Sequence, residues 1–215
     1  MFFQAAIDEC SLEVGIAQLE RLRFVSGIDI IEIGNPLILN FGGQAVEAFR
    51  SIALDRIYAD LKIIDFPEKI LPFYGGLGVT RASLLCSMPD TVLVKSLEIC
   101  REENIEPFVS TMGYPVDGVR SRVLRISALG FKNIVCHGCG MSQDEAFLDL
   151  LNRLKACENI PSISLIAAGG INEHNAYALR KYRLAGIIVG RGMISATAPD
   201  NLVATIKLNC QSAIP

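Results

Sequence analysis

The sequence has no tryptophan and few aromatic residues: 7% of its 215 residues are aromatic, although 51% are hydrophobic. Its apolar content is therefore mainly aliphatic, which is typical of buried parallel strands and too high for a disordered chain. Net charge is also small, because 20 Lys and Arg residues stand against 23 Asp and Glu residues, giving −3. This balance excludes the basic footprint of a nucleic-acid-binding protein.

Signals for membranes and secretion are missing as well. No apolar run reaches the ~18 residues that a membrane span needs. The first residues, MFFQAAIDEC, lack the basic segment of a signal peptide. The seven cysteines are an odd number and predict no disulfide framework. We therefore expect no membrane partner and a reduced, cytoplasmic location.

One cysteine pair, Cys136 and Cys139, has the CxxC spacing of redox and zinc sites. No second CxxC pair exists that could complete a zinc site, and the chain has only two histidines. Incidental buried thiols are therefore the favoured interpretation.

Short apolar runs alternate with longer amphipathic stretches along the whole chain. The runs predict strands at residues 3–7, 28–33, 57–61, 82–86, 107–111, 133–136, 164–168 and 186–189. The stretches predict helices at 11–22 (with Ser11 as N-cap), 44–51, 90–103, 116–129, 143–157, 173–182 and 199–211, and a weaker helix from Phe66 that is broken by Pro72 and Gly75-Gly76.

Eight strand–helix units in strict alternation predict a parallel sheet with right-handed crossovers. Eight units favour closure into a (β/α)8 TIM barrel, with residues 1–215 as one catalytic domain. An open doubly wound sheet is the alternative, but such a sheet usually has a glycine fingerprint after its first strand. Here that strand ends in Ile7-Asp8-Glu9.

Polar residues fall where the predicted strands end, which is where barrel enzymes place their chemistry. They are Asp8, Glu32, Asp60, Lys62, Asp65, Ser110, Thr111, His137 and the glycine pairs Gly169-Gly170 and Gly190-x-Gly192. Ionisable residues at five strand ends, joined by aliphatic runs, are hard to explain by packing alone.

Asp60 and Lys62 are two residues apart, so they point to the same face of a strand. They could form a structural ion pair, or they could supply a metal-binding carboxylate and an ammonium for a developing oxyanion. Glu32 could be a lone acid at the barrel end. Together with Asp60 it would provide two hard oxygen ligands, which is the usual protein contribution to a Mg²⁺ site.

His137 follows an apolar strand, where a histidine is either structural or, at a strand end, a proton carrier near neutral pH. His174 lies at a predicted helix start and is interpreted as a surface or capping residue.

Glycine loops follow strands seven and eight, the two loops that build the phosphate site of many barrels. Gly169, Gly170 and Gly190 would let backbone N–H groups approach a phosphate, and Arg191 could clamp it. Tight turns chosen for conformation alone are the alternative.

In this order, these residues resemble the orotidine 5′-phosphate decarboxylase suprafamily, in particular its group of 3-hexulose-6-phosphate synthases and 3-keto-L-gulonate-6-phosphate decarboxylases. The most specific motif is Asp60-x-Lys62-x-x-Asp65, and Glu32 in its I-E-x-G context matches the magnesium-dependent branch. The matching segments are QAAID, IIEIGNPLI, YADLKIID, IVCHG, AAGGI and IVGRGM, which cover the chain.

The resemblance implies a mechanism. Mg²⁺, held by Glu32 and Asp60, would chelate a 1,2-enediolate of a phosphorylated sugar, which Lys62 would stabilise. Asp65 would reach the neighbouring subunit's site in a homodimer with active sites shared at the interface. In addition, Asp8 would lie at the sugar and His137 would help to move protons, while Gly169, Gly170, Gly190 and Arg191 would hold the phosphate.

Two reactions are typical of this group, and the sequence departs from both because Ser110 stands where strand five carries an acid. Gly138-Cys139-Gly140 lacks the arginine of the decarboxylases and favours the synthase reaction of formaldehyde with D-ribulose 5-phosphate, whereas Arg191 favours the decarboxylase. A phosphosugar-binding homologue without catalysis, and a phosphate-binding isomerase or epimerase, are the other hypotheses.

Overall fold

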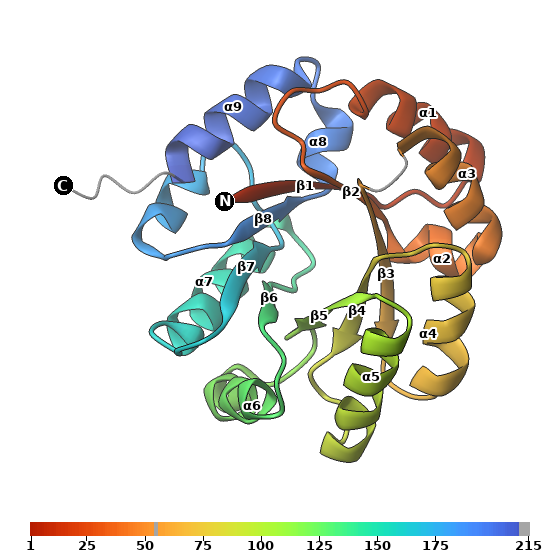
Figure 1. The fold of residues 1–215 in the computed structure, drawn as a ribbon. Coiled ribbons are helices and arrows are strands. Elements are labelled where there is room, and N and C mark those ends of the chain that lie inside the picture. The colour runs from red at the N-terminus through yellow and green to blue at the C-terminus, as the bar shows by residue number, and fades with distance from the viewer. Residues whose placement is uncertain (54–55, 211–215) are drawn as a thin grey trace.

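The computed structural model describes residues 1–53 and 56–210, and its strands form a closed parallel barrel in the order β1 to β8 (Figure 1). The strands are β1 (Phe2–Ile7), β2 (Ile30–Ile33), β3 (Ile57–Ile63), β4 (Arg81–Leu85), β5 (Glu106–Ser110), β6 (Asn133–His137), β7 (Ser164–Ala168) and β8 (Gly186–Val189). β1 pairs with β8 as well as with β2, which closes the sheet. The predicted (β/α)8 barrel is confirmed, and the open-sheet alternative is wrong.

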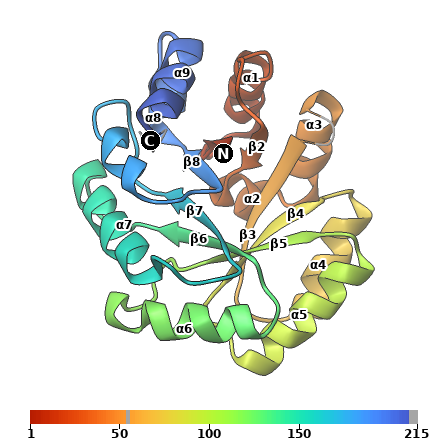
Figure 2. The same cartoon turned by 60° about the vertical axis from the view of Figure 1, so that its left-hand side comes forward.

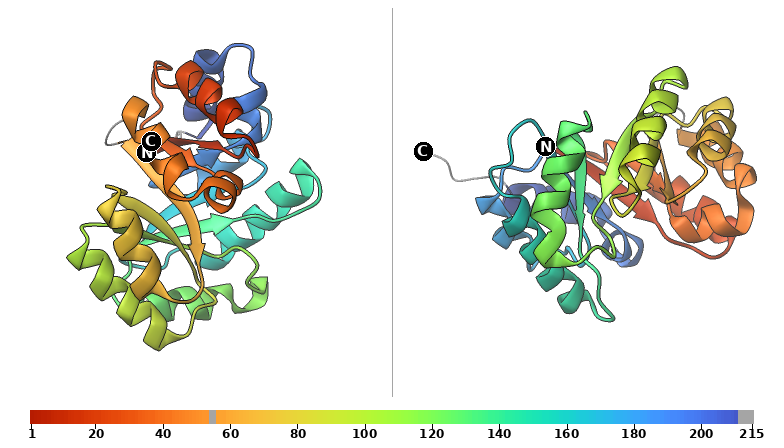
Figure 3. Two further views of the ribbon diagram at one scale, coloured as in Figure 1. Left: turned by 90° about the vertical axis from the view of Figure 1, so that its right-hand side faces the viewer. Right: turned by 90° about the horizontal axis from the view of Figure 1, so that it is seen from below.

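Helices surround the barrel, as the turned views show (Figures 2 and 3). They are α1 (Leu12–Leu22), α2 (Asn35–Phe41), α3 (Gly43–Ala53), α4 (Pro67–Gly76), α5 (Asp90–Glu102), α6 (Val116–Ala128), α7 (Gln143–Cys157), the 3₁₀ helix η2 (Ala176–Lys181), α8 (Arg191–Ser195) and α9 (Pro199–Cys210). None of the helices in the described residues combines the length and the apolar character that crossing a membrane requires.

The inside of the barrel is filled by its own side chains, so the barrel is a packed core and not a pore. Tyr58 and Phe108 meet edge to face, with ring centroids 5.2 Å apart, and Phe2 also meets Phe108 edge to face, with centroids 6.4 Å apart. This inner cluster comprises Ala6, Ile30, Tyr58, Phe108, Val135, Ile166, Ala168 and Ile188. Residues two positions further along each strand must therefore lie nearer the barrel mouth on the same inner face.

Local sequence signals fix several helix ends, and the cap at Ser11 was predicted. Ser11 caps α1, because its Oγ accepts the Val14 N–H at 3.4 Å. α7 begins with a capping box in which Ser142 and Glu145 bond each other's backbone N–H groups. α6 is followed by Gly130 with a φ of 103°, a left-handed conformation that glycine adopts without cost.

Four elements differ from the predictions. α2 and α8 were not predicted, since each spans only two turns or fewer. α4 continues through Pro72 and ends at Gly76. In place of the α-helix predicted at 173–182, the chain has a turn followed by the 3₁₀ helix η2 (Ala176–Lys181), because the Asn172 side chain accepts the N–H groups of His174 and Asn175 in a competing turn. Gln211, the predicted end of the last helix, lies outside the described residues.

Candidate active site at the barrel mouth

A cavity of about 430 Å³ opens at the carboxyl ends of the strands. It brings together nine of the ten predicted site residues: Asp8, Glu32, Asp60, Lys62, His137, Gly169, Gly170, Gly190 and Arg191. Asp65 is the exception. It is exposed, it is not among the residues lining the cavity, and its Oδ1 accepts the N–H of Phe66 at 2.8 Å. On one subunit, therefore, Asp65 lies outside the site.

Two buried carboxylates, Glu32 and Asp60, form the acidic side of the cavity, each with 6% of its surface exposed. Burial, followed by the charges of Asp60 and Asp8, raises the pKa of Glu32 well above its ordinary value. Desolvation in the barrel mouth and the charge of Asp60 raise the pKa of Asp8 in the same direction. Three carboxyl groups thus crowd one another, which is an electrostatic cost that a bound cation would relieve.

The donor set at this cluster fits a hard divalent cation such as Mg²⁺, which takes one or two carboxylates and completes its shell with water and substrate oxygens. No group of three or more His, Cys, Asp or Glu side chains arranged to hold a metal is found within the part of the chain that the structure describes. Glu32 and Asp60 stay the candidate ligands that the sequence analysis named.

Lys62 makes an ion pair with Asp60 Oδ2, so the two predicted residues do share a face. The backbone reaches this arrangement in an unexpected way. Lys62 has a φ of 46°, in the left-handed region, and the pairing of β3 with β4 shifts register between Ala59 and Ile63. A bulge thus turns the ammonium toward the carboxylates, whereas the prediction assumed a regular strand.

Ser83 on β4 ties this motif together, and the sequence analysis missed it. Its Oγ donates to Asp60 Oδ1 at 2.7 Å and accepts the Lys62 N–H at 2.7 Å. Gln4 on β1 was also missed as a site residue, although its spacing of two from Ala6 and four from Asp8 places it on the same inner face. Its Nε2 donates to Glu32 Oε2, while its buried Oε1 has no hydrogen-bond partner among the described residues.

His137 ends β6 and faces the cavity from the side opposite β2 and β3. Burial lowers its pKa to about 4, with Asp60 acting in the opposite direction. The imidazole is therefore neutral at pH 7 and can accept a proton, and burial places its pKa below the neutral range. His174, by contrast, is exposed, as expected for a surface residue.

The glycine loops after β7 and β8 line the other end of the cavity. Gly169 and Gly170 have φ angles of 101° and 69°, which other residues rarely adopt. A Cβ atom at Gly170 would also collide with the backbone of α7. Both positions therefore require glycine for conformational reasons, and this requirement is compatible with an approach of backbone N–H groups to a phosphate.

Helix α8 starts at Arg191, whose side chain is exposed at the cavity edge. The helix is anchored from outside the barrel by Arg21 of α1. Its guanidinium donates to the carbonyl oxygens of Ala196 at 2.7 Å and of Met193 and Ile194 at 2.8 Å.

Ser110 occupies the last position of β5, two residues after the inward-facing Phe108, so it lies on the inner face near the mouth. It is 4% exposed, and its Oγ accepts the Met112 N–H at 3.2 Å. A hydroxyl thus stands at the strand-five position, where it cannot act as an acid or base near pH 7.

The cysteine pair was only partly described by the prediction. Cys136 is buried and lies against Cys157, whereas Cys139 is exposed and lines the cavity, so the expectation of two buried thiols is wrong for Cys139. Both thiols are free.

Fold and site together define a (β/α)8 barrel whose mouth holds an acid–lysine–histidine cluster beside two glycine loops. No family model matches the chain. Two curated relatives are 3-keto-L-gulonate-6-phosphate decarboxylase of Escherichia coli strain K12, 28% identical over 200 residues (91% of this chain, 88% of the relative), and 3-hexulose-6-phosphate synthase of Mycobacterium gastri, 26% identical (93% and 94%).

Among solved structures, a 3-hexulose-6-phosphate synthase superposes with a TM-score of 0.84 at 25% identity, covering 97% of this chain and 99% of that one. These matches confirm the resemblance to the 3-hexulose-6-phosphate synthase and 3-keto-L-gulonate-6-phosphate decarboxylase group. The relatives include both of its reactions, so the comparisons by themselves do not choose between them.

Proposed function

We propose that this chain is a phosphosugar carbon–carbon lyase that works through a 1,2-enediolate. The observation that carries the proposal is a single cavity in which the Glu32–Asp60–Lys62 cluster faces the glycine loops beside Arg191. A phosphate bound at these loops would place the far end of a short sugar at the acid–lysine cluster. Curated relatives that match along nearly their whole length support the same assignment.

The residues of the cavity have distinct tasks in this mechanism. Glycine N–H groups and Arg191 bind the phosphate and orient the sugar. Neutral His137 accepts a proton from the substrate carbon, and the Lys62 ammonium stabilises the negative charge that develops on the adjacent oxygen. Asp60 holds that ammonium in place through their ion pair.

We further propose that Mg²⁺ is the cofactor, with Glu32 and Asp60 as its protein ligands. When bound, it would supply positive charge for two substrate oxygens. The crowding of three carboxyl groups, seen in the raised pKa values of Glu32 and Asp8, supports a cation here.

For the reaction itself, we favour the synthase: aldol addition of formaldehyde to D-ribulose 5-phosphate and its reversal. The sequence Gly138-Cys139-Gly140 offers no cation behind His137 for a carboxylate substrate. Arg191 and the 28% identity with a curated decarboxylase keep 3-keto-L-gulonate-6-phosphate decarboxylation as the second candidate.

The experiment is to assay both reactions with Mg²⁺ and after EDTA treatment. We expect formaldehyde-dependent turnover of D-ribulose 5-phosphate that EDTA abolishes and Mg²⁺ restores. Full activity in EDTA would contradict the metal assignment. Substrate binding without turnover in either assay would favour a non-catalytic homologue, and activity gained by Ser110→Asp would support that interpretation further.

We also propose a homodimer in which Asp65 completes the partner's site. Asp65 is exposed in the loop after β3, and its two neighbours in the sequence, Ile64 (55%) and Phe66 (60%), are large apolar residues that are exposed too. Leu39 of α2 (76%) and Phe73 of α4 (54%) are further exposed apolar side chains. Light scattering should give twice the chain mass. A monomeric, fully active enzyme would rule this arrangement out.

The cytoplasmic location stays a prediction.

A further inference from the structure

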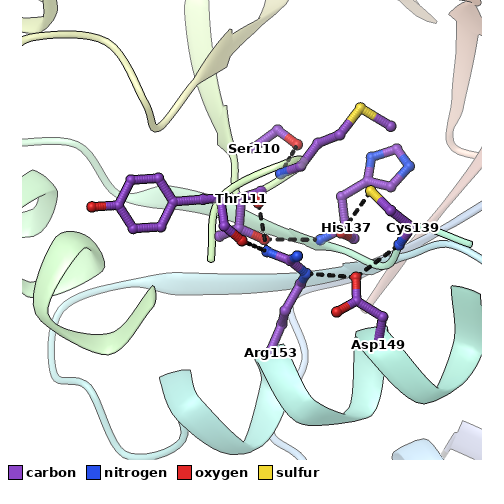
Figure 4. A network of polar contacts seen from close by, with 8 residues as sticks. Ser110, Thr111, His137, Cys139, Asp149 and Arg153 are labelled. Carbon is purple, nitrogen blue, oxygen red and sulfur yellow. Dashed lines mark hydrogen bonds and ion pairs between the residues drawn. The ribbon is translucent and has the colours of Figure 1, made fainter. Parts of the chain in front are cut away.

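A buried arginine lies beneath the His137 side of the cavity, at the centre of a polar network (Figure 4). The Arg153 side chain of α7 is 5% exposed. Its Nε donates to Asp149 Oδ2 at 2.8 Å, and its Nη1 donates to the carbonyl oxygens of Thr111 at 2.6 Å and Tyr114 at 2.9 Å. One guanidinium thus binds a carboxylate on its own helix and two carbonyls of the loop after β5.

The same network returns to His137 along two paths. Thr111 Oγ1 accepts the His137 N–H at 3.2 Å, and Asp149 Oδ2 accepts the Cys139 N–H at 2.8 Å. The Cys139 thiol lies 3.8 Å from the His137 carbonyl oxygen. The contacts therefore form a closed ring that starts and ends at His137, with α7 supplying the two charged members.

The loop after His137 is also pressed directly onto α7. A Cβ atom at Gly138 would collide with the carbonyl oxygen of Ala146, and one at Gly140 would lie too close to the backbone N of the same residue. The Gly138 N–H donates to the Ala168 carbonyl oxygen of β7 at 2.8 Å. Since the loop cannot move away from this helix without losing these contacts, the place of α7 decides where His137 sits.

From this ring we infer that Asp149 and Arg153 are positioning residues that fix the orientation of the His137 imidazole in the cavity. Neither is among the described residues that line the cavity, so they act through the backbone of His137 and Cys139. A buried ion pair adds little stability compared with well-packed apolar residues, which makes a geometric role the better explanation. The inference rests on the proposed function only for the role of His137 in proton transfer.

Arginine is required here by geometry, because its planar fork serves three oxygen atoms at once. We expect Arg153→Lys and Asp149→Asn to lower kcat roughly 10- to 100-fold, as a small misplacement of a catalytic group does. KM should change less than about twofold, because the phosphate loops are untouched.

The control is Arg122→Lys. Arg122 of α6 also binds a carboxylate, that of Asp90, and two carbonyl oxygens, those of Cys86 and Met88. These carbonyls belong to the loop after β4, away from His137. We expect this variant to lose stability and to keep kcat. An equal loss of kcat in both arginine variants would reduce the role of Arg153 to general stability.

Two measurements on the enzyme without substrate are independent of the reaction. Amide hydrogen exchange, followed by NMR, should be faster at His137 and Cys139 in Asp149→Asn. Labelling of the Cys139 thiol should change severalfold in rate, with exposed Cys10 as internal reference. Unchanged exchange and labelling would overturn the inference, whatever reaction the enzyme catalyses.

A milder pair of variants covers the case in which the Arg153 variants fail to fold. Thr111→Ser keeps the hydroxyl that accepts the His137 N–H, and Thr111→Val removes it while leaving the carbonyl that binds Arg153. We expect near-normal kcat for Thr111→Ser and a loss of roughly 10-fold or more for Thr111→Val. Equal activities in the two variants would contradict the ring of contacts as the means of positioning.

Discussion

Lys62 joins a charged side chain to a left-handed backbone, a combination that costs about 1–3 kcal/mol for a residue other than glycine. Two contacts hold it there: the ion pair with Asp60 and the acceptance of its N–H by Ser83. Such strain persists only where the surroundings impose it, and here it aims an ammonium at two carboxylates. The arrangement makes Lys62 the most specific single element of the proposed chemistry.

Replacing Lys62 by alanine should lower kcat/KM at least about 100-fold, because the charge that stabilises the developing oxyanion is lost. Steady-state kinetics measure the effect, and circular dichroism checks the fold. Lys95→Ala is the control, since Lys95 is exposed and forms its ion pair with Glu98 on its own helix. If Lys62→Ala turns over like the parent enzyme, the mechanism is wrong.

Ser83→Ala should reduce both stability and activity. The substitution leaves a buried Asp60 oxygen and the Lys62 N–H without their partner. Each unsatisfied group lowers the free energy of unfolding by about 1–3 kcal/mol. Urea unfolding and kinetics measure the two effects. Ser96→Ala provides the matched control, because Ser96 is equally buried and bonds the Val92 carbonyl within α5. We expect the control to lose stability only. Parent-like kinetics for Ser83→Ala would contradict a role in holding Asp60 and Lys62.

These residues also show what a sequence can reveal about a site. Asp8, Glu32, Asp60 and His137 could be predicted because each polar side chain ends an apolar run. Ser83 could not, because its role depends on how β4 lies against β3, and nothing local encodes that register. Arg153 was missed for a related reason: α7 looks like an ordinary amphipathic helix, and only the packed structure places Arg153 beneath a loop.

At the scale of elements, α8 is too short to be stable by itself and depends on its neighbours. Arg21 of α1 binds three carbonyl oxygens near its C-terminal end, although the two segments lie far apart in the sequence. Because α8 begins at Arg191, this contact sets the position of the candidate phosphate loop. The sequence predicted the loop from its glycines but neither the helix nor its anchor.

Arg21→Met should therefore raise KM for the phosphorylated substrate about 10-fold, with kcat changed less than about twofold, because binding is weakened and the reacting end is not. Arg21→Lys should restore little of the loss, since one ammonium cannot reproduce the guanidinium fork. Titration with inorganic phosphate, read by calorimetry, measures the same effect without turnover. An unchanged KM in Arg21→Met would show that α8 holds its place alone.

At the scale of the molecule, the strands were predicted to within a few residues because aliphatic runs are a strong signal in a parallel barrel. Helices were harder where side chains compete with the backbone, as Asn172 does ahead of η2.

The stability of the whole molecule should depend on pH through His137. His137 has a pKa of about 4 in the folded chain, against about 6.5 for an unfolded histidine.

The unfolded state therefore binds a proton on His137 at higher pH than the folded state does. The free energy of unfolding should be highest above pH 6.5 and should fall by about 1.4 kcal/mol per pH unit between about 6.5 and 4 from this group. Urea unfolding across that range measures the slope. We expect His137→Gln to flatten it and His174→Asn to leave it unchanged. The same slope in both variants would assign the effect to other groups.

The pairing of β1 with β8 has a consequence for folding of the chain during its synthesis on the ribosome. Asp8 follows β1 and Arg191 follows β8, so the two edges of the cavity are synthesised well apart in time. One edge of β1 stays unpaired until β8 has left the exit tunnel. The nascent chain therefore has no complete barrel mouth until β8 has emerged and paired with β1.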